Sequence, residues 1–219
     1  MKKNEKKQFV VLGLGRFGSG VACRLSKMGY EVLAVDRNEQ YVEDVTPFVT
    51  QAVQADATDE AALDAIGIHN FDVAVVSIGS NIRDSILVTV LCKEKGVPYV
   101  MAKAVDDLHA KVLRKVGADR VVFPEREMGQ RVARSLVMPN ILDLMELSDG
   151  FQVAEVVAPD SWCGRTLVEI NVRRNYGVSV IAIHRGAQFI ASPGAEEKVQ
   201  PGDVMVLLGK TKDIEAINR

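Results

Sequence analysis

The sequence contains few of the residues that build metal centres or disulfide frameworks. Its 219 residues include only three cysteines and three histidines, which are Cys23, Cys92, Cys163, His69, His109 and His184. They lie far apart along the chain, so none of them belongs to a motif with metal-ligand spacing. An odd number of separated cysteines is typical of proteins that stay in a reducing cytosol. We therefore expect these side chains to serve packing or the surface.

A large net charge and long apolar runs are also missing. Lys and Arg total 27 against 29 Asp and Glu, and a net charge of −2 argues against a nucleic-acid partner. The apolar runs are much too short to cross a bilayer. The basic stretch 1–7 is not followed by an apolar segment, so we expect no signal peptide. Hydrophobic residues make up 47% of the chain, enough for one large or two small packed domains.

The first half of the chain alternates apolar runs with amphipathic segments. Six runs are expected to form strands, at residues 9–12, 32–35, 51–54, 73–77, 99–101 and 120–123. Between them lie helix-like patterns, of which 84–95 and 107–116 are the clearest. This alternation predicts an α/β fold of the Rossmann type, a doubly wound parallel sheet over residues 1–137. A ligand of such a fold binds at the carboxyl ends of the strands, where the strand order reverses.

The first predicted strand ends in the motif Gly13-Leu14-Gly15-Arg16-Phe17-Gly18. Gly13 permits the tight turn off the strand, Gly15 lets a pyrophosphate approach the backbone, and Gly18 lets the next helix pack closely. The free N–H groups at the start of that helix face the phosphates. Arg16, inside the loop, can reach the distal phosphates of a nucleotide or remain a surface arginine. The motif predicts nucleotide binding.

A carboxylate, Asp36, follows the second predicted strand, about 20 residues after the glycines, where dinucleotide folds hold the adenosine ribose. The alternatives are a solvated acid or a helix cap. After the third strand come Asp56, Ala57 and Thr58; Asp56 accepts from an adenine amino group or caps the following helix. The two carboxylates thus have competing interpretations.

Three further strand ends complete the predicted site. The fourth strand is followed by the small or polar residues Ser77, Ile78, Gly79 and Asn81, which permit close backbone approach to a ligand. Lys103 ends the fifth strand. Glu125 follows the sixth strand and holds a cation such as Mg²⁺ or Ca²⁺ beside the phosphates, or serves as an acid favoured at a helix start.

Beyond the predicted sheet, residues 124–137 read as a helix with an apolar stripe of Met128, Val132 and Leu136 that can bury against another subunit. Pro139 breaks the chain, and residues 138–150 are expected to form a linker with a short apolar helix at 140–147. From residue 151 to 219 the pattern predicts a small α+β lobe. Its strands are expected at 152–157, 178–184, 188–191 and 204–208, and a short helix at 167–172. Such a lobe is marginal alone, so we expect it to dimerise.

Over nearly its whole length the chain resembles the cytosolic gating subunits of bacterial Ktr/Trk-type potassium uptake systems, and more closely the KtrA-like branch. Their RCK domain (regulator of K⁺ conductance) has a Rossmann lobe and a small C-terminal lobe. The matching segments are 13–18, 35–36, 55–58, 70–72, 103–104, 117–119, 124–125, 167–177 and 192–193. The sequence departs from the family pattern at Arg37, where an apolar residue is common, and at Trp162-Cys163.

The resemblance implies a homo-oligomer, a ring of usually eight subunits built from dimers, on the inner face of the cell membrane. The ring docks on a membrane-embedded, KtrB-like transporter. ATP and ADP compete for the Rossmann site, NAD(H) binds some relatives, and Arg16 reaches the nucleotide of a neighbouring subunit. Phe17, Arg37 and Lys103 join the nucleotide site. Cyclic di-AMP binds the C-terminal lobe of several relatives at positions matching Val172, Arg173, Val178, Val180, Ile181 and Pro193, although the same cleft can be plain dimer packing.

Two other functions compete with this interpretation. An NAD(P)-dependent oxidoreductase needs a catalytic acid over the nicotinamide. Tyr41 and Tyr176 lack a lysine four residues later, and Tyr99, which has Lys103 at that spacing, lies in a predicted strand. A nucleotide or redox sensor that represses transcription needs a DNA-binding element, and the sequence shows neither a helix-turn-helix signal nor a basic stripe. We therefore expect a regulatory protein that performs no chemistry on its nucleotide.

Overall fold

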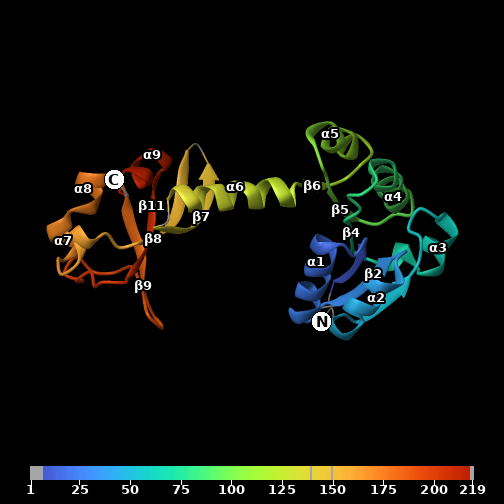
Figure 1. Ribbon diagram of the computed structural model, residues 1–219, viewed down its shortest axis with the longest axis horizontal. Helices are drawn as coiled ribbons and strands as arrows, with labels where there is room; N and C mark the ends of the chain where they lie inside the picture. The colour runs from blue at the N-terminus through green and yellow to red at the C-terminus, as the bar shows by residue number, and fades with distance from the viewer. Residues whose placement is uncertain (1–6, 139, 149, 218–219) are drawn as a thin grey trace, which may run out of the picture. The chain divides into compact units, whose positions relative to one another are not determined.

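The computed structural model describes residues 7–138, 140–148 and 150–217, and the chain divides into two compact units (Figure 1). The first comprises Met1–Glu127 and the second Met128–Arg219. Residues 1–6 of the basic stretch, Pro139 with the break expected there, and Asp149 lie outside the described residues. Among the helices of the described part, none is both long and apolar enough to cross a membrane.

The N-terminal unit is built on a six-stranded parallel sheet in the order β3-β2-β1-β4-β5-β6, which confirms the predicted doubly wound fold. The strands are β1 (Gln8–Leu12), β2 (Glu31–Asp36), β3 (Gln51–Gln54), β4 (Val73–Val76), β5 (Tyr99–Lys103) and β6 (Arg120–Val122). The helices are α1 (Arg16–Lys27), α2 (Glu39–Val45), α3 (Glu60–Ala65), α4 (Ile82–Glu94) and α5 (Asp107–Lys115). All six predicted strands are present, with ends that differ by at most two residues.

Successive residues of the central strands serve opposite faces of this sheet. Val10 and Leu12 of β1 belong to a core cluster with buried residues of α3, α4 and α5. Val11, between them, packs in a second cluster with residues of α1 and α2. Because side chains alternate along a strand, a strand that is apolar at every position must be covered on both faces. Helices therefore cover both faces of the sheet, as Figure 1 shows.

The turn from β1 into α1 depends on two glycines, as the motif predicts. Gly13 has a φ of +97°, in the left-handed region that favours glycine. Gly18, buried in α1, lies so close to the turn that an added Cβ would stand 1.9 Å from the Gly13 carbonyl oxygen. The helix thus rests on the backbone of the turn, and its N-terminus is fixed at the end of β1.

Gly18→Ala should destabilise the N-terminal unit by about 3 kcal/mol, because the new methyl group collides with a backbone oxygen that cannot move aside. Gly20→Ala is the matched control on the same helix: it has no atom within 4 Å of its added Cβ. It should stabilise the helix by about 0.5–1 kcal/mol. Urea unfolding followed by circular dichroism measures both; equal effects would contradict the packing role of Gly18.

The C-terminal unit contains a five-stranded sheet in the order β10-β9-β11-β8-β7. Its strands are β7 (Ile141–Ser148), β8 (Phe151–Val157), β9 (Ser179–Arg185), β10 (Gln188–Ala191) and β11 (Val204–Lys210). Helix α6 (Pro124–Val137) confirms the predicted helix and crosses the division between the units; α7 (Leu167–Ile170), α8 (Val172–Tyr176) and α9 (Thr211–Ala216) are short. The expected α+β lobe is thus present.

One local prediction in this unit is wrong, and a second is confirmed only over a shorter helix. The short helix expected at 140–147 is the strand β7, because its backbone pairs with β8 in an antiparallel hairpin turned at Gly150, whose φ is +76°. The single helix expected at 167–172 is interrupted at Asn171, whose φ of +49° ends α7 before α8 begins. In both segments tertiary pairing or a local turn overrides the apolar spacing.

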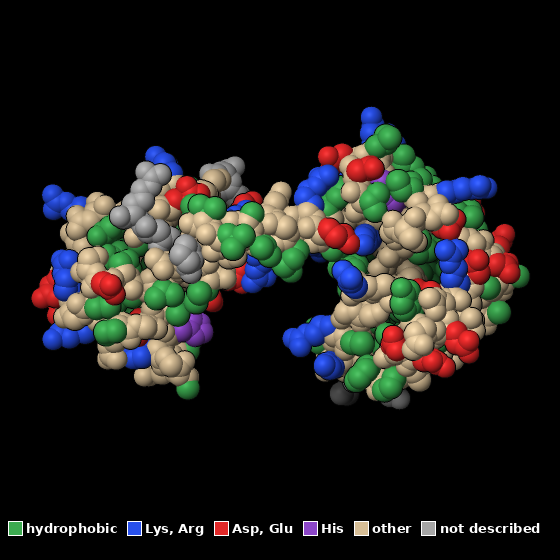
Figure 2. Space-filling view, in the orientation of Figure 1, with side chains coloured by type: hydrophobic (Ala, Val, Ile, Leu, Met, Phe, Trp, Pro, Cys, Tyr) green, Lys and Arg blue, Asp and Glu red, His purple; other side chains and the backbone are tan. Residues whose placement is uncertain are grey.

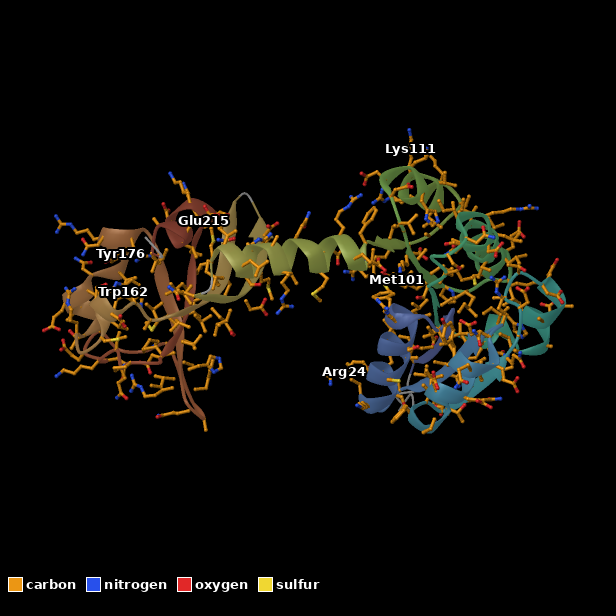
Figure 3. All side chains as sticks on the ribbon, viewed as in Figure 1. Arg24, Met101, Lys111, Trp162, Tyr176 and Glu215 are labelled. Carbon is orange, nitrogen blue, oxygen red and sulfur yellow. The ribbon has the colours of Figure 1, made fainter. Side chains whose placement is uncertain are left out.

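The core of this unit is organised around Trp162, the one tryptophan in the sequence, which is fully buried. Its ring meets Tyr176 edge-on, with centroids 5.1 Å apart (Figure 3). Aromatic pairs in this geometry stabilise a core beyond the area they bury. The contact joins the segment after β8 to α8.

An ion pair between a buried carboxylate and a partly exposed arginine connects β9 to the turn before β11. Asp203, which is 1% exposed, accepts two hydrogen bonds from Arg185, both at 2.9 Å, and one from Gln200 N. Arg185 also pairs with Glu197 at 2.9 Å. Burial alone raises the pKa of Asp203, but the bonds from Arg185 and Gln200 outweigh it, so the pKa lies below its ordinary value. The ionised form therefore stabilises the folded unit.

Asp203→Asn should destabilise the C-terminal unit by about 2–4 kcal/mol, because it removes the buried charge that accepts two hydrogen bonds from the partly exposed Arg185. Since the folded pKa is depressed, the wild-type contribution is full above the unfolded pKa of about 3.9 and is lost as pH falls through the folded value. The fluorescence of the buried Trp162 during urea unfolding measures the stability of this unit at each pH. In Asp203→Asn the free energy of unfolding should fall less at acid pH than in the wild type, whereas the exposed Glu196→Gln control should follow the wild type. The same pH dependence of stability in both variants would contradict the assignment.

Candidate functional site

A cavity of about 380 Å³ opens at the carboxyl ends of the strands of the N-terminal unit. Such a volume accommodates a small ligand. Predicted site residues that line it are Gly13, Gly15, Asp36, Arg37, Asp56, Ala57, Thr58, Ser77, Ile78, Gly79 and Lys103. The predicted residues Arg16, Phe17, Gly18, Asn81 and Glu125 are not in this lining. Of the other lining residues, Ser80 lies in the predicted loop 77–81, and Val35 and Ala55 lie in the matching segments 35–36 and 55–58. The sequence did not indicate Asn38, Tyr41 and Asp84.

Asp36 joins the end of β2 to the glycine loop. Its Oδ2 accepts a hydrogen bond from Leu14 N at 2.6 Å and its Oδ1 accepts one from Asn38 N at 2.8 Å. Asn38, not Asp36, caps α2, because its side chain accepts from Gln40 N. Asp36 is therefore neither a freely solvated acid nor the helix cap. A carboxylate can accept about four hydrogen bonds, so capacity remains for ligand hydroxyls.

The sequence leaves two roles for Asp56 after β3, helix cap or acceptor for an adenine amino group, and the structure gives the cap to Asp59. Asp59 caps α3, accepting from Ala61 N at 2.9 Å. Asp56 Oδ1 accepts from the Thr58 hydroxyl at 2.7 Å and from Thr58 N at 2.9 Å. The Thr58 hydroxyl is the main cause that holds the pKa of Asp56 below its ordinary value. Among the described residues Oδ2 has no partner, so this ionised oxygen is available to a donor on a ligand.

The glycine loop presents a helix N-terminus to the cavity. Helix α1 begins at Arg16 after the exposed Gly15, with no side-chain cap and no acid in its first turn. Nothing lies within 4 Å of a Cβ added to Gly15. Below the loop, the buried Ser77 hydroxyl, which also lines the cavity, has no hydrogen-bond partner in the described structure. The arrangement offers N–H donors and a hydroxyl to an anion.

A lysine lies at the other end of the cavity. Lys103 donates to Glu125 in the first turn of α6, and its side chain is 13% exposed. Its stem crosses Gly79, where an added Cβ would stand 3.2 Å from Lys103 Cε. The bond from Lys103 holds the pKa of Glu125 below its usual value. No group of three His, Cys, Asp or Glu side chains in the described residues is placed to hold a metal ion.

A second cavity, of about 550 Å³, lies in the C-terminal unit. Five predicted residues line it: Val172, Arg173, Val178, Val180 and Pro193; the sixth, Ile181, does not. Leu167, Val168, Asn171, Ser179 and Ala195 complete its wall. It is a largely apolar depression with one exposed guanidinium, that of Arg173, which forms no ion pair with the described residues.

Comparison with known proteins gives the family. Residues 9–124 match the TrkA-N domain and residues 153–219 the TrkA-C domain. The chain is 42% identical over 214 residues to "Ktr system potassium uptake protein C" of Bacillus subtilis (strain 168), covering 98% of this chain and 97% of that protein. The chain belongs to the Ktr/TrkA family of potassium-uptake proteins. This membership favours the potassium-uptake interpretation over the oxidoreductase alternative.

Solved structures show that the Ktr/TrkA chain has the fold of an RCK domain. It superposes on the "GsuK RCK domain" with a TM-score of 0.67 at 17% identity, covering 100% of this chain and 48% of that one. It superposes on the "GsuK channel bound to NAD" with a TM-score of 0.66 at 18% identity, covering 99% of this chain and 40% of that one. The chain thus spans about half the length of those proteins or less.

Proposed function

We propose that this chain is a regulatory subunit that binds an adenine nucleotide and gates a membrane-embedded potassium transporter. The observation that carries the proposal is the cavity at the carboxyl ends of the strands, where Asp36 anchors an open glycine loop. In a protein of a potassium-uptake family, a nucleotide there acts as a signal. It regulates only if it binds two conformations with different affinity.

ATP, ADP and NAD(H) all contain an adenosine that carries phosphates, and this cavity suits that part of the molecule. The ribose hydroxyls donate to Asp36, the phosphates lie at the N-terminus of α1 with the Ser77 hydroxyl nearby, and the adenine amino group donates to Asp56 Oδ2. The NAD recorded for the GsuK channel supports a nucleotide of this class. Arg16 is exposed, so it is free to reach a nucleotide on a neighbouring subunit and to favour ATP over ADP.

Glu125 contributes a cation site in the assembled protein. Within one chain its charge is balanced by Lys103. When phosphates attract Lys103, Glu125 is left to bind Mg²⁺ or Ca²⁺ together with phosphate oxygens, which offsets repulsion between nucleotides at a subunit interface. The ligands that one chain lacks would then come from the nucleotide.

The assembly we propose is a ring of dimers, an octamer, docked on a KtrB-like transporter at the cytoplasmic face of the membrane. Helix α6 has no buried residue among those described, and it exposes Met128, Val132 and Leu136. Apolar side chains along this helix are visible in Figure 2. A helix with an uncovered apolar stripe marks an interaction surface, and a second copy of the chain is its partner.

The cavity of the C-terminal unit is proposed to bind cyclic di-AMP. Val172, Val178 and Val180 provide apolar contacts for the adenine rings, with Pro193 at the edge. The guanidinium of Arg173 pairs with a phosphate. Its open shape suits a ligand shared between two lobes of a dimer.

Asp36→Ala should weaken ATP, ADP and NADH together by about 2–3 kcal/mol, because all three share the ribose that Asp36 holds. Isothermal calorimetry measures the affinities, and the melting temperature without ligand shows whether the fold is intact. The exposed Asp44→Ala is the control and should leave all three unchanged. The nucleotide assignment would be contradicted if the wild type bound none of the three nucleotides, or if Asp36→Ala bound them as tightly as the wild type.

Arg173→Ala should abolish cyclic di-AMP binding while ATP binding is retained, because the guanidinium belongs only to the C-terminal cavity. Calorimetry should give one cyclic di-AMP per two chains in the wild type. Arg174→Ala, the exposed neighbour outside that cavity, should behave as wild type. No heat and no thermal shift at high ligand concentration would reject the site and leave the lobe as an assembly domain.

Gating itself is tested in proteoliposomes that contain a Ktr-type transporter. Addition of the purified chain should make potassium flux depend on the nucleotide present, and Asp36→Ala should remove that dependence. A potassium flux that changes neither with the added chain nor with the nucleotide would contradict the proposed function.

A further inference from the structure

Arg37 and Asp84 form an ion pair in the lining of the cavity of the N-terminal unit. Arg37 follows β2 and Asp84 lies in the first turn of α4, and both line the cavity. Arg37 Nη1 and Asp84 Oδ2 are 3.8 Å apart, with 66% of the Arg37 side chain and 21% of the Asp84 side chain exposed. An ion pair this long and exposed contributes little to stability. The position of the pair in the cavity lining is therefore better explained by a role in ligand binding than by a role in stability.

The backbone of Arg37 is fixed while its side chain is loosely held. Gln54 Nε2 donates to the Arg37 carbonyl oxygen at 3.2 Å, and Asn38 N donates to Asp36 on the other side. Among the described residues the guanidinium forms an ion pair only with Asp84 and donates no hydrogen bond. It can therefore move within reach of the cavity without disturbing the strand end.

The surroundings of Arg37 suit a base rather than a phosphate. Three carboxylates, those of Asp36, Asp56 and Asp84, line this end of the cavity, and they would repel a phosphate. Small apolar side chains, those of Val35, Ala55 and Ala57, also line the cavity. A flat neutral ring with an amino group matches a lining that combines carboxylate acceptors with apolar side chains.

The two cations of the described cavity lining also lie on opposite sides of the glycine loop. Arg37 follows β2 and Lys103 ends β5, with β1 and β4 between them. Neighbouring strands lie about 4.8 Å apart, so these strand ends are separated by about 14 Å. The helix N-terminus after β1 and Lys103 serve the phosphates. A phosphate therefore has no need of Arg37.

We propose that Arg37 stacks its guanidinium plane on the adenine ring and that Asp84 is the positioning residue that holds this plane over the base. This inference rests on the proposed nucleotide function and deepens it. A planar guanidinium can lie parallel to an aromatic ring and contact it over a broad area, whereas a lysine ammonium lacks this planar surface. The attraction of Arg37 to Asp56 is the smallest of the causes that lower the pKa of Asp56, consistent with a guanidinium near the amino-group acceptor.

Calorimetry with ADP and ATP on single variants tests the stacking. Arg37→Ala should weaken both nucleotides by the same factor, about three- to tenfold, because they share the base. Arg37→Lys should not restore affinity, since it keeps the charge but loses the plane. Arg83→Ala, an exposed neighbour of Asp84 outside the cavity, should match wild type. A larger loss for ATP than for ADP, rescue by lysine, or unchanged affinity in Arg37→Ala would each overturn the inference.

A double-mutant cycle tests the positioning role. Asp84→Asn should weaken ADP about two- to fivefold alone and should have no further effect in an Arg37→Ala background. Equal effects in both backgrounds would show that Asp84 acts without Arg37 and would overturn its part. If the wild type binds neither nucleotide, the proposed function fails together with this inference. If the wild type binds and Arg37→Ala is unchanged, only the inference fails.

Discussion

The close contact between helix α1 and the Gly13 carbonyl is the constraint on which the N-terminal unit depends. Because Gly18 has no side chain, the helix can rest on the backbone of the turn. This places the unpaired N–H groups of the first helical turn at the end of β1, where the strand order reverses. Asp36 then fixes the loop from the neighbouring strand through Leu14. The cavity is thus formed by backbone geometry before any ligand-specific side chain is considered.

Most of this arrangement was predictable from the sequence because its causes are local. Apolar runs, the three glycines and Asp36 lie in one short segment, and the turn needs glycine for a steric reason that does not depend on distant residues. The same holds for Asp56 and Lys103, which follow strands directly. A parallel sheet brings the ends of its strands to one edge, so the residues that follow them come together.

The rest depends on contacts between segments far apart in the chain. Asp84 reaches Arg37 from the first turn of α4, and no pattern around either residue indicates the pair. The sequence predicts a helix where the structure has the strand β7, because the apolar residues of this segment also fit helical spacing and only pairing with β8 decides between the two. The break at Asn171 depends on a left-handed backbone that asparagine tolerates, which spacing alone does not reveal.

The alternation of β1 between two cores limits how the sequence can change in length. Val10 and Leu12 pack on one face of the sheet and Val11 on the other, and all three are fully buried. One inserted residue would move every later side chain of the strand to the opposite face. It would also shift the glycine turn by about 3.3 Å along the strand axis. Substitutions among apolar residues are tolerable in β1, whereas insertions and deletions are not, so length variation within this strand is excluded.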